Sequence, residues 1–575
     1  MLRRIFSYMK EYKKYAWLAL ICIGVEVVLE IMVPKLMADL IDIGVTNSDV
    51  PYIINKGIQM AVCAVAALIL GVGSARFSAL AGQGLGANIR KAEYEKLQSY
   101  SFSNIDHFSV SSLVTRLTSD VTNIQNAVST GMRPFGRSPV MLIFATTLAF
   151  QINSTLALVF LVALPVLAVL LIIIIINVGP RYGRMQGAVD LVNRCIEENL
   201  TAVRVVKSYV RGDYEIEKFR NVNDNLKNES EKAFVIAVLN MPAMQFVMYS
   251  TILGILLIGV RLINSGQMMI GQLTSFLSYV LLILNSLMMM SNVFLLMTRS
   301  LASAERIMKV IDEPIDITDE NAKDIEVKKG EIEFNHVWFK YNETAKEYVL
   351  SDVSFHINAG QTVGIIGQTG SSKTTLIQLI PRLYDASKGE IKIDGINVKE
   401  YPVRHLRDAI SVVLQKNTLF SGSLIDNLRW GDENATLDEI KEACSIACVD
   451  EFIDRLPGGL DAEMGQEGVN VSGGQKQRIC IARAILKKPK VLILDDSTSA
   501  VDTATEGKIK NALAKKLPDM TKIIIAQRIS SVCQADQIII MDGGRVDAIG
   551  THESLLRTNK IYQEIYESQK EGADL

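Results

Sequence analysis

Long apolar runs fill the first half of the chain and are absent from the second half. Six runs approach or exceed the length of about 20 apolar residues that a helix needs to cross a hydrocarbon core. They lie at roughly residues 16–43, 57–81, 134–151, 155–178, 238–263 and 271–298. The chain of 575 residues is 49% apolar but still 21% charged. This mixture predicts a polytopic α-helical membrane domain with six transmembrane helices, fused to a soluble domain.

Basic residues predict the orientation of these helices. They gather before the first run and in the connections after the second and fourth runs, at Arg3, Arg4, Lys10, Lys13, Lys14, Arg90, Lys91, Lys96, Arg116, Arg181, Arg184, Arg194, Arg204, Lys207 and Arg211. Since positively charged segments stay in the cytosol, both termini are expected there. The two basic connections are each about 50 residues long. As paired helices they would extend roughly 35–40 Å into the cytosol.

The change in composition also predicts the domain boundaries. Residues 1–312 would form the membrane domain, residues 313–329 a polar linker, and residues 330–575 the soluble domain. In the soluble domain, helical patterns alternate with strand-like patterns at 330–341, 353–357, 360–367, 491–494 and 523–525. This alternation predicts an α/β fold. The net charge of −2 gives no support for a nucleic-acid partner.

The segment GIIGQTGSSKTTL indicates a phosphate-binding loop, because it follows a strand and opens a helix. Backbone N–H groups there favour a polyphosphate, Lys373 would reach the β- and γ-phosphates of ATP, and Thr374 would hold Mg²⁺. The residues predicted to bind ATP in this loop are Gly367, Thr369, Gly370, Ser371, Ser372, Lys373, Thr374 and Thr375. Ser372 replaces a glycine of the usual pattern, which adds a Cβ near the phosphates. The alternative is a loop too altered to bind ATP tightly.

Two carboxylates follow the apolar strand Val491–Leu494. Asp495 suits the Mg²⁺ shell. Asp496 occupies the next position, where a general base would orient the attacking water. Together with the phosphate-binding loop, this pair predicts a Mg²⁺-dependent ATPase site.

With these motifs in order, residues 330–560 resemble the nucleotide-binding domain of an ATP-binding-cassette (ABC) transporter. Because six predicted spans precede it, the whole chain resembles a bacterial exporter half-transporter of the multidrug type. The resemblance implies that Tyr341 stacks on adenine and that Gln415 senses Mg²⁺ and the membrane domain. It implies a signature motif at Ser472, Gly473, Gly474 and Gln475, a D-loop at 499–502, and coupling helices within 104–120 and 198–219.

The chain departs from the family pattern at two catalytic positions. Asp496 stands where the family has a glutamate, and Gln527 stands where it has the switch histidine. Aspartate is one CH₂ shorter, which withdraws the carboxylate by about 1.5 Å, and a misplacement of about 1 Å can cost around 10²-fold in rate. Gln527 can donate a hydrogen bond but cannot carry the charge of an imidazole. Both changes are expected to preserve ATP binding and weaken hydrolysis.

These two departures indicate which kind of subunit the chain pairs with. In this family two nucleotide-binding domains meet head to tail, and each site combines one chain's phosphate-binding loop with the other chain's signature motif. A weak catalytic half beside an intact signature predicts a heterodimer with a second half-transporter in the bacterial cytoplasmic membrane, in contact with lipid and a small amphipathic substrate. The alternatives are a homodimeric lipid or peptide exporter and an ATP-binding regulatory or sensor subunit without transport.

Two acidic residues in the first predicted span, Glu26 and Glu30, lie one helical turn apart. Charges at this depth are costly and are either functional or paired. Arg76 in the second span is a candidate partner. The two hypotheses are a cavity that attracts a cationic or amphipathic substrate and an internal ion pair.

Overall fold

The computed structural model describes residues 1–320, 322–497 and 500–571. Within its helices the side chains of a few residues are not described, namely Leu2, Leu161, Leu164, Ala168, Leu171, Ile174, Ile175, Asn240, Leu287, Ser291, Asn292, Phe294, Leu295, Thr298 and Glu571. The chain folds into two compact units. The first comprises residues 1–98 and 110–312, and the second comprises residues 99–109 and 313–575.

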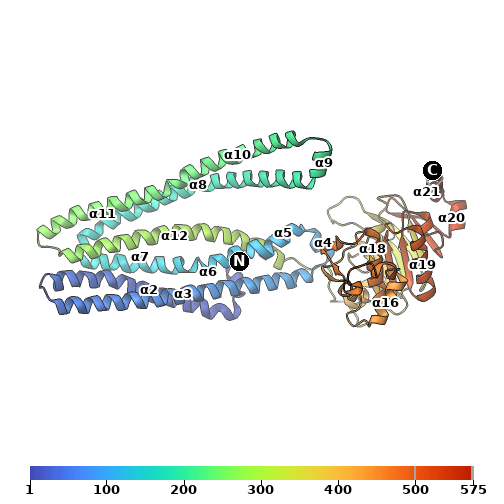
Figure 1. Ribbon diagram of the computed structural model, residues 1–575, viewed down its shortest axis with the longest axis horizontal. Helices are drawn as coiled ribbons and strands as arrows, with labels where there is room; N and C mark the ends of the chain where they lie inside the picture. Colours follow the sequence, from blue (N-terminus) through green and yellow to red (C-terminus); the bar gives the residue numbers. More distant parts are fainter. Residues whose placement is uncertain (321, 498–499, 572–575) are drawn as a thin grey trace. The chain divides into compact units, whose positions relative to one another are not determined.

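The first unit is entirely helical in its described residues (Figure 1). Its elements are α1 (Leu2–Ser7), η1 (Lys10–Tyr12), α2 (Lys13–Asp39), η2 (Leu40–Val45), α3 (Val50–Gln98), α5 (Val110–Thr115), η3 (Arg116–Asp120), α6 (Val121–Ser129), α7 (Met132–Ile152), α8 (Ser154–Thr201), α9 (Val203–Ser208), α10 (Gly212–Val238), α11 (Asn240–Asn264) and α12 (Ile270–Ile311). The longest helices, α3 and α8, have 49 and 48 residues. At a rise of 1.5 Å per residue each is about 70 Å long, more than twice the thickness of a hydrocarbon core.

Five helical stretches in the described residues are long and apolar enough to cross a membrane. They are Lys10–Val45, Val50–Gln98, Val110–Ile152, Gly212–Asn264 and Ile270–Met290. The fourth predicted span, 155–178, falls on α8, where Ser154–Leu167 forms a shorter apolar helical stretch. Asn153 separates α7 from α8 and caps α8, since its side chain accepts a hydrogen bond from the Leu156 N–H.

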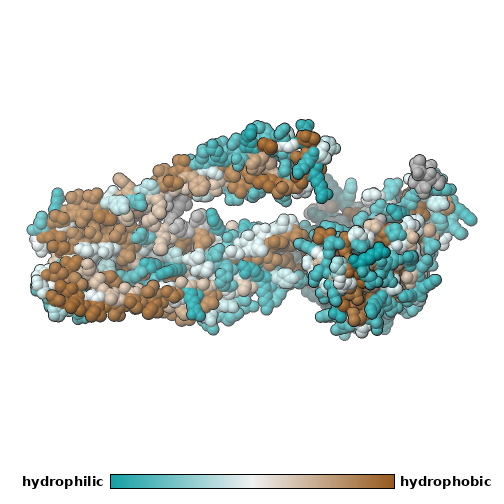
Figure 2. All heavy atoms as spheres, in the orientation of Figure 1, coloured by the Kyte–Doolittle hydropathy of each residue, from teal (hydrophilic) through white to brown (hydrophobic). Residues whose placement is uncertain are grey.

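The surface of the first unit changes polarity along its helices. Apolar side chains on α3 such as Val62, Leu68 and Val72 are exposed. In Figure 2 hydrophobic residues cover much of α2, α3 and α11 near the α2–α3 and α11–α12 connections, whereas hydrophilic residues become frequent over α10. An exposed apolar band of this kind is expected where lipid is the solvent.

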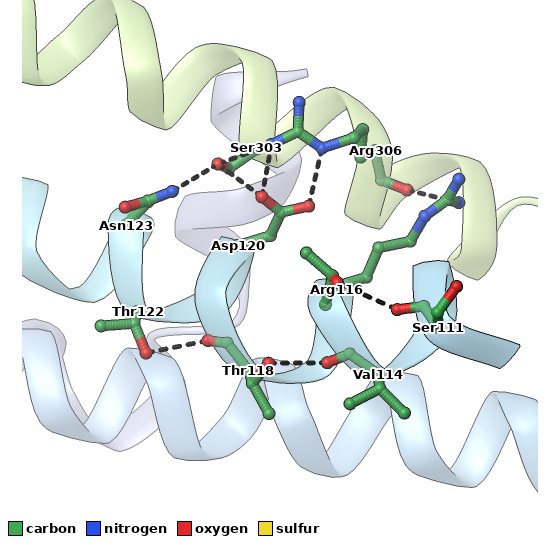
Figure 3. Close-up of polar contacts among 10 residues, drawn as sticks. Ser111, Val114, Arg116, Thr118, Asp120, Thr122, Asn123, Ser303 and Arg306 are labelled. Carbon is green, nitrogen blue, oxygen red and sulfur yellow. Dashed lines mark hydrogen bonds and ion pairs between the residues drawn. The ribbon is translucent and has the colours of Figure 1, made fainter. Parts of the chain in front are cut away.

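A turn of π-helix, η3, interrupts the chain between α5 and α6. Its last residue, Asp120, is buried and accepts hydrogen bonds from Ser303 Oγ (2.9 Å) and Arg306 Nε (2.7 Å) on α12 (Figure 3). Arg116 at the start of the turn donates to the backbone carbonyl of Arg306 at 3.1 Å. The turn is therefore fixed to α12 from both of its ends.

The second unit contains two main sheets, built from β1 (Ile332–Phe339), β2 (Leu350–Ile357), β3 (Thr362–Ile366), β4 (Lys388–Ile393), β5 (Ile396–Asn397), β6 (Ile410–Val413), β9 (Val491–Asp495), β10 (Thr521–Ile525), β11 (Gln537–Asp542) and β12 (Arg545–Gly550). A four-stranded antiparallel sheet has the order β2-β1-β4-β5, and a six-stranded sheet has the order β12-β11-β3-β10-β9-β6. In the larger sheet β11, β3, β10, β9 and β6 are parallel. A short hairpin pairs β7 (Gly422–Ser423) with β8 (Glu463–Met464).

Helices complete this unit: α4 (Phe102–Asp106), α13 (Lys373–Leu379), α14 (Val403–Asp408), α15 (Leu424–Arg429), α16 (Leu437–Ile446), α17 (Asp450–Ile453), α18 (Gly473–Leu486), α19 (Thr503–Lys516), α20 (His552–Thr558) and α21 (Lys560–Glu571). Short 3₁₀ turns are η4 (Val398–Glu400), η5 (Gly459–Asp461), η6 (Gln466–Gly468) and η7 (Ile529–Ser531). The apolar strands of the larger sheet are buried on both faces, as parallel sheets are. One hydrophobic core joins this sheet to the smaller sheet and α13, and another joins it to α16, α18 and α19.

The segment 99–109 packs with the second unit although it lies far from it in sequence. Ser101 caps α4 in a reciprocal capping box with Asn104. Tyr384 Oη donates to Asp106 Oδ2 at 2.7 Å, and Asn104 Nδ2 donates to the Pro314 carbonyl at 2.8 Å. These contacts hold α4, which overlaps the start of the first segment that resembles a coupling helix, within the second unit.

Candidate nucleotide site

The site forms where the parallel strands end. Strands β3, β10, β9 and β6 are neighbours in the larger sheet and run in the same direction, so the residues that follow them gather at one edge. Ligands of α/β sheets bind at this carboxyl edge. The phosphate-binding loop follows β3, Asp496 follows β9, Gln527 follows β10, and Gln415 follows β6.

The phosphate-binding loop needs glycine at two points. A Cβ on Gly367 would lie 2.2 Å from the carbonyl oxygen of Met541, and Gly370 has a φ of +87°. Thr369 and Ser371 belong to the same turn, which ends where Ser372 precedes α13. Ser372 has φ +67° and ψ 24°, a left-handed conformation that glycine adopts without cost. Ser372 therefore keeps the backbone shape of the glycine that it replaces.

Lys373 folds back over its own loop. Its ammonium group donates to the carbonyl oxygens of Gly367 and Gln368, both at 2.8 Å, and to Ser371 Oγ at 3.1 Å. Burial lowers the pKa of Lys373, while the charges of Asp495 and Asp496 oppose this shift. The cation is thus held in the loop where a polyphosphate would lie.

The predicted Mg²⁺ ligands lie together. Thr374 Oγ1 donates to Asp495 Oδ2 at 3.0 Å, and Asp495 is buried. Burial raises the pKa of Asp495, and the neighbouring charge of Asp496 adds to this shift. A hydroxyl and a carboxylate suit Mg²⁺, which keeps several waters and takes few ligands from the protein. The donor set and the glycine-lined loop therefore fit Mg²⁺ and a nucleotide.

Asp496 is bound by two amides. Gln527 Nε2 donates to Asp496 Oδ2 at 3.2 Å, and the side chain of Gln415 also hydrogen-bonds to the Asp496 carboxylate. Burial raises the pKa of Asp496, whereas the Gln415 bond and the charges of Lys373 and Arg528 oppose this shift. The structure thus brings Asp496, Gln527 and Gln415 together. Arg528 was not among the predicted residues, although its position next to Gln527 could have indicated it.

Tyr341 lies beside the phosphate-binding loop. Its hydroxyl is 2.9 Å from Thr375 Oγ1 and donates to Gln378 Oε1 at 3.2 Å. Its ring packs edge-on against Phe339 and Tyr384, with centroids 4.9 and 5.2 Å away. The side chain is 46% exposed, so a face of the ring remains accessible for an adenine.

The signature residues begin α18. Ser472 caps the helix by accepting from the Gln475 N–H, and the Gln475 side chain accepts from the Ser472 N–H at 2.9 Å. A Cβ on Gly474 would lie 2.7 Å from the Ala500 carbonyl oxygen, so only glycine fits between α18 and the D-loop. Ser499 lies outside the described residues. No hydrogen bond or ion pair joins residues 472–475 to the phosphate-binding loop in the described part of the chain.

The charged residues of the first unit pair differently from the prediction. Glu26 is bound by Arg133 Nη2 at 2.6 Å and Arg137 Nη1 at 3.4 Å, and Glu30 by Arg137 Nη2 at 2.6 Å. Arg76 does not pair with either glutamate in the described residues. The expectation of Arg76 as a partner was wrong because Arg133 and Arg137, one turn apart on α7, reach the glutamates from a third helix. Their spacing of four residues was the signal in the sequence.

Comparisons with known proteins agree with this architecture. Residues 16–287 match the family model of the ABC transporter transmembrane region, and residues 350–499 match that of the ABC transporter. An ABC transporter ATP-binding protein of Bacillus subtilis (strain 168) is 38% identical over 575 residues, which is 100% of both chains. An ATP-dependent lipid A-core flippase of Pseudomonas putida is 32% identical over 576 residues, covering 98% of this chain and 95% of the flippase.

Two further proteins are similar over most of the chain. A putative multidrug export ATP-binding/permease protein of Bacillus subtilis (strain 168) is 32% identical, covering 84% of this chain and 83% of that protein. A solved structure of a bacterial Atm1-family ABC exporter with ATP bound has the same fold, with a TM-score of 0.83, 22% identity and 98% coverage of both chains. The predicted fusion of a helical membrane domain to an α/β nucleotide-binding domain is confirmed. The chain belongs to the ABC transporter family, as a multi-pass exporter half-transporter with its ATP-binding domain on the same polypeptide.

Proposed function

We propose that this chain is one subunit of a heterodimeric ATP-driven exporter of amphipathic or drug-like molecules. It would lie in a bacterial cytoplasmic membrane with both termini in the cytosol. Its own ATP site would turn over slowly, and its signature motif would complete a competent site on the partner. The observation that carries the proposal is the pairing of Asp496 with Gln527 at the end of β9 and β10.

This pair is poorly suited to general-base catalysis. The carboxylate of Asp496 is one CH₂ shorter than that of a glutamate, and two amides, from Gln527 and Gln415, bind it. An amide side chain neither takes up a proton nor carries a charge at neutral pH. Orientation of the attacking water and stabilisation of the developing charge would therefore both be weakened.

The binding half of the same site is retained. Lys373 would exchange its loop carbonyl contacts for phosphate oxygens, and Thr374 and Asp495 would hold Mg²⁺. Bound Mg²⁺-ATP would supply the phosphoanhydride bond that is hydrolysed. Gly367 and Gly370 keep the loop backbone open to phosphates, and Tyr341 offers its ring to the adenine. A site with these features would hold ATP for long periods.

The signature motif supports the role in the partner's site. Ser472 uses its hydroxyl to satisfy the Gln475 N–H, which fixes the start of α18. The first N–H groups of a helix otherwise lack intrahelical partners and favour an anion. The Ser472 and Gln475 side chains bond to each other's backbone N–H groups, and this start of α18 would face the γ-phosphate of the partner's ATP.

The experiment uses the chain purified together with a second half-transporter encoded beside it. ATP turnover is measured for Asp496→Ala and for alanine at the partner's matching acidic residue, with the exposed carboxylate variant Asp542→Ala as the control. We expect only the partner's substitution to abolish turnover. Equal loss with Asp496→Ala would make Asp496 a working base and would overturn the proposal.

The same preparation distinguishes the alternatives. If this chain alone forms a stable dimer that hydrolyses ATP, and forms no complex with the half-transporter encoded beside it, the homodimeric exporter is supported. ATP-dependent dye uptake into inside-out vesicles containing the pair would support export. Nucleotide binding without movement of any tested dye would instead support the sensor subunit, for which the weak catalytic half is the favouring observation.

A further inference from the structure

A cavity of about 780 Å³ lies within the first unit, between α2, α3, α7 and α12. Its walls are mostly apolar and small, with Val33, Pro34, Ala64, Ala67, Leu68, Gly71, Val72, Ala75, Leu281 and Leu282 among the lining residues. Four charged side chains also line it: Glu26, Glu30, Arg133 and Arg137. The volume is that of a site for a small organic ligand.

The four charges form one alternating series. Arg133 binds Glu26, Arg137 bridges Glu26 and Glu30, and the sum of the charges is zero. The inner carboxylate, Glu26, is only 4% exposed, whereas the two ends are more accessible, Arg133 at 42% and Glu30 at 28%. The cavity therefore presents a positive group at one end of the series and a negative group at the other.

Packing holds the series in place. Ser74 Oγ lies 3.5 Å from Glu26 Oε2. A Cβ on Gly71 would lie 3.1 Å from Glu26 Oε1 and 3.3 Å from Arg133 Nη2, so α3 approaches the pair as closely as a glycine allows. The charges are thus fixed beside the small residues of α3, and they cannot move away without breaking a buried pair.

We propose that this cavity binds an amphiphile with a zwitterionic headgroup. Arg133 would bind the anionic group, Glu30 would bind the cationic group, and the apolar walls would take the chain. This inference rests on the proposed export of amphipathic molecules, and it adds that the exported molecules carry one positive and one negative charge. A purely cationic molecule would meet Arg133 and a purely anionic one would meet Glu30, so each would gain one favourable contact and one repulsive contact.

The test measures binding without nucleotide, so it does not depend on ATP turnover or transport. Native mass spectrometry of the detergent-solubilised complex counts bound probes of equal chain length: zwitterionic lysophosphatidylcholine, anionic lysophosphatidylglycerol and a cationic alkyltrimethylammonium. We expect the wild-type protein to bind the zwitterionic probe about tenfold more tightly than the other two. Each of these exchanges one favourable contact for a repulsive one, and a tenfold ratio corresponds to about 1.4 kcal/mol.

Substitutions should then change the preference in opposite directions. Arg133→Gln leaves Glu26 with less compensation and should favour the cationic probe, whereas Glu30→Gln should favour the anionic probe. Arg133→Lys keeps the charge and should retain the zwitterionic preference. Arg76→Gln is the control, because Arg76 lies on α3 but does not line the cavity. This variant should leave the order of probe preference unchanged.

Two outcomes overturn the proposal. Equal binding of the three probes to the wild-type protein would show that the series does not select charge. An unchanged order of preference in both Arg133→Gln and Glu30→Gln would show that the probes bind elsewhere. If the zwitterionic preference holds but the pair neither hydrolyses ATP nor transports, the charge assignment stands and the export function fails.

Discussion

Two residues of the nucleotide site have backbones that glycine would adopt more easily. Ser372 has a φ of +67° and Asp496 a φ of +46°. The sequence showed that both positions depart from the family motif, and the structure places Thr374 beside Asp495 and Gln527 beside Asp496. The sequence could not predict the positive φ of Asp496, because this backbone conformation belongs to the turn that directly follows β9. Nor could it predict that Gln415 and Gln527 both bind one carboxylate.

Replacing Ser372 by glycine should stabilise the protein. The left-handed conformation costs a residue with a Cβ roughly 1–2 kcal/mol, and Ser372→Gly removes this cost. Part of the gain is offset because glycine is more flexible when unfolded, so we expect a net gain of about 0.5–1 kcal/mol in thermal unfolding without nucleotide. Ser371→Gly is the matched control, since Ser371 has no positive φ and accepts a hydrogen bond from Lys373. An equal gain in the control would contradict the explanation.

Lengthening the carboxylate at Asp496 should restore hydrolysis at this site. Asp496→Glu combined with Gln527→His adds the missing CH₂ and the imidazole, and we expect single-turnover hydrolysis to rise by about 10-fold to 10²-fold. The measurement uses a complex whose partner site has been inactivated. Asp496→Asn with the same Gln527→His serves as the control and should show no rise. A rate unaffected by the added length would mean that hydrolysis is limited elsewhere.

At the scale of elements, the sequence predicted the helical spans and the strands of the nucleotide-binding domain well. The length of an apolar run and the spacing of its apolar residues are enough to distinguish a membrane helix from a buried strand. The π-helical turn η3 was not predictable. Asp120 at its end accepts hydrogen bonds from Ser303 and Arg306 on α12, and a contact between residues so far apart in the sequence is not visible in a local pattern (Figure 3). Nor was the burial of Glu93 on α3 predictable, since its neighbours include the charges of Arg116 and Asp120 in this turn.

Glu93 should make the stability of the helical unit depend on pH. It lies beyond the predicted span 57–81, is fully buried, and neither carboxylate oxygen has a hydrogen-bond partner among the described residues. Burial, reinforced by the charge of Asp120 and opposed by Arg116 and Arg90, raises the pKa of Glu93 to about 7 from its ordinary 4.5. The folded state therefore binds the proton more tightly than the unfolded state. The stabilisation is complete below pH 4.5 and is lost as the pH rises through 7.

The variant Glu93→Gln should remove this dependence. It resembles the protonated acid, so its advantage over the wild type should grow between pH 5 and pH 8 to about 2–3 kcal/mol. Chemical unfolding in detergent at several pH values measures this difference in the free energy of unfolding. Glu95→Gln, an exposed carboxylate on the same helix, should follow the wild type. Parallel pH profiles for Glu93→Gln and the wild type would rule out this role.

At the scale of the whole molecule, composition separated a membrane part from a soluble part. It did not predict that residues 99–109 belong with the soluble part, because only tertiary contacts such as that of Asp106 with Tyr384 reveal it. The segment predicted as a linker is also held: the Asp394 carboxylate accepts hydrogen bonds from the backbone N–H groups of residues 328–331, at 2.7–3.0 Å.

Removing the Tyr384 hydroxyl should loosen α4. A hydrogen bond to a carboxylate contributes about 1.5–3 kcal/mol, so Tyr384→Phe should accelerate amide hydrogen exchange in residues 99–109 by about tenfold or more. Tyr348→Phe removes a hydroxyl from another aromatic residue of the same unit and should leave this exchange unchanged. Unchanged exchange in Tyr384→Phe would mean that the ring contact with Phe102 holds the segment.

The polypeptide passes between its two units three times, after Gln98, after Ser109 and after Asp312. The ATP-binding unit is therefore not a module that one splice junction can graft onto another membrane domain. A chimera joined only at the linker would pair Tyr384 with a foreign α4. Functional recombination between relatives would require residues 99–109 and 313–575 to be inherited together. These two distant stretches should therefore share one ancestry, even where the helices between them have another.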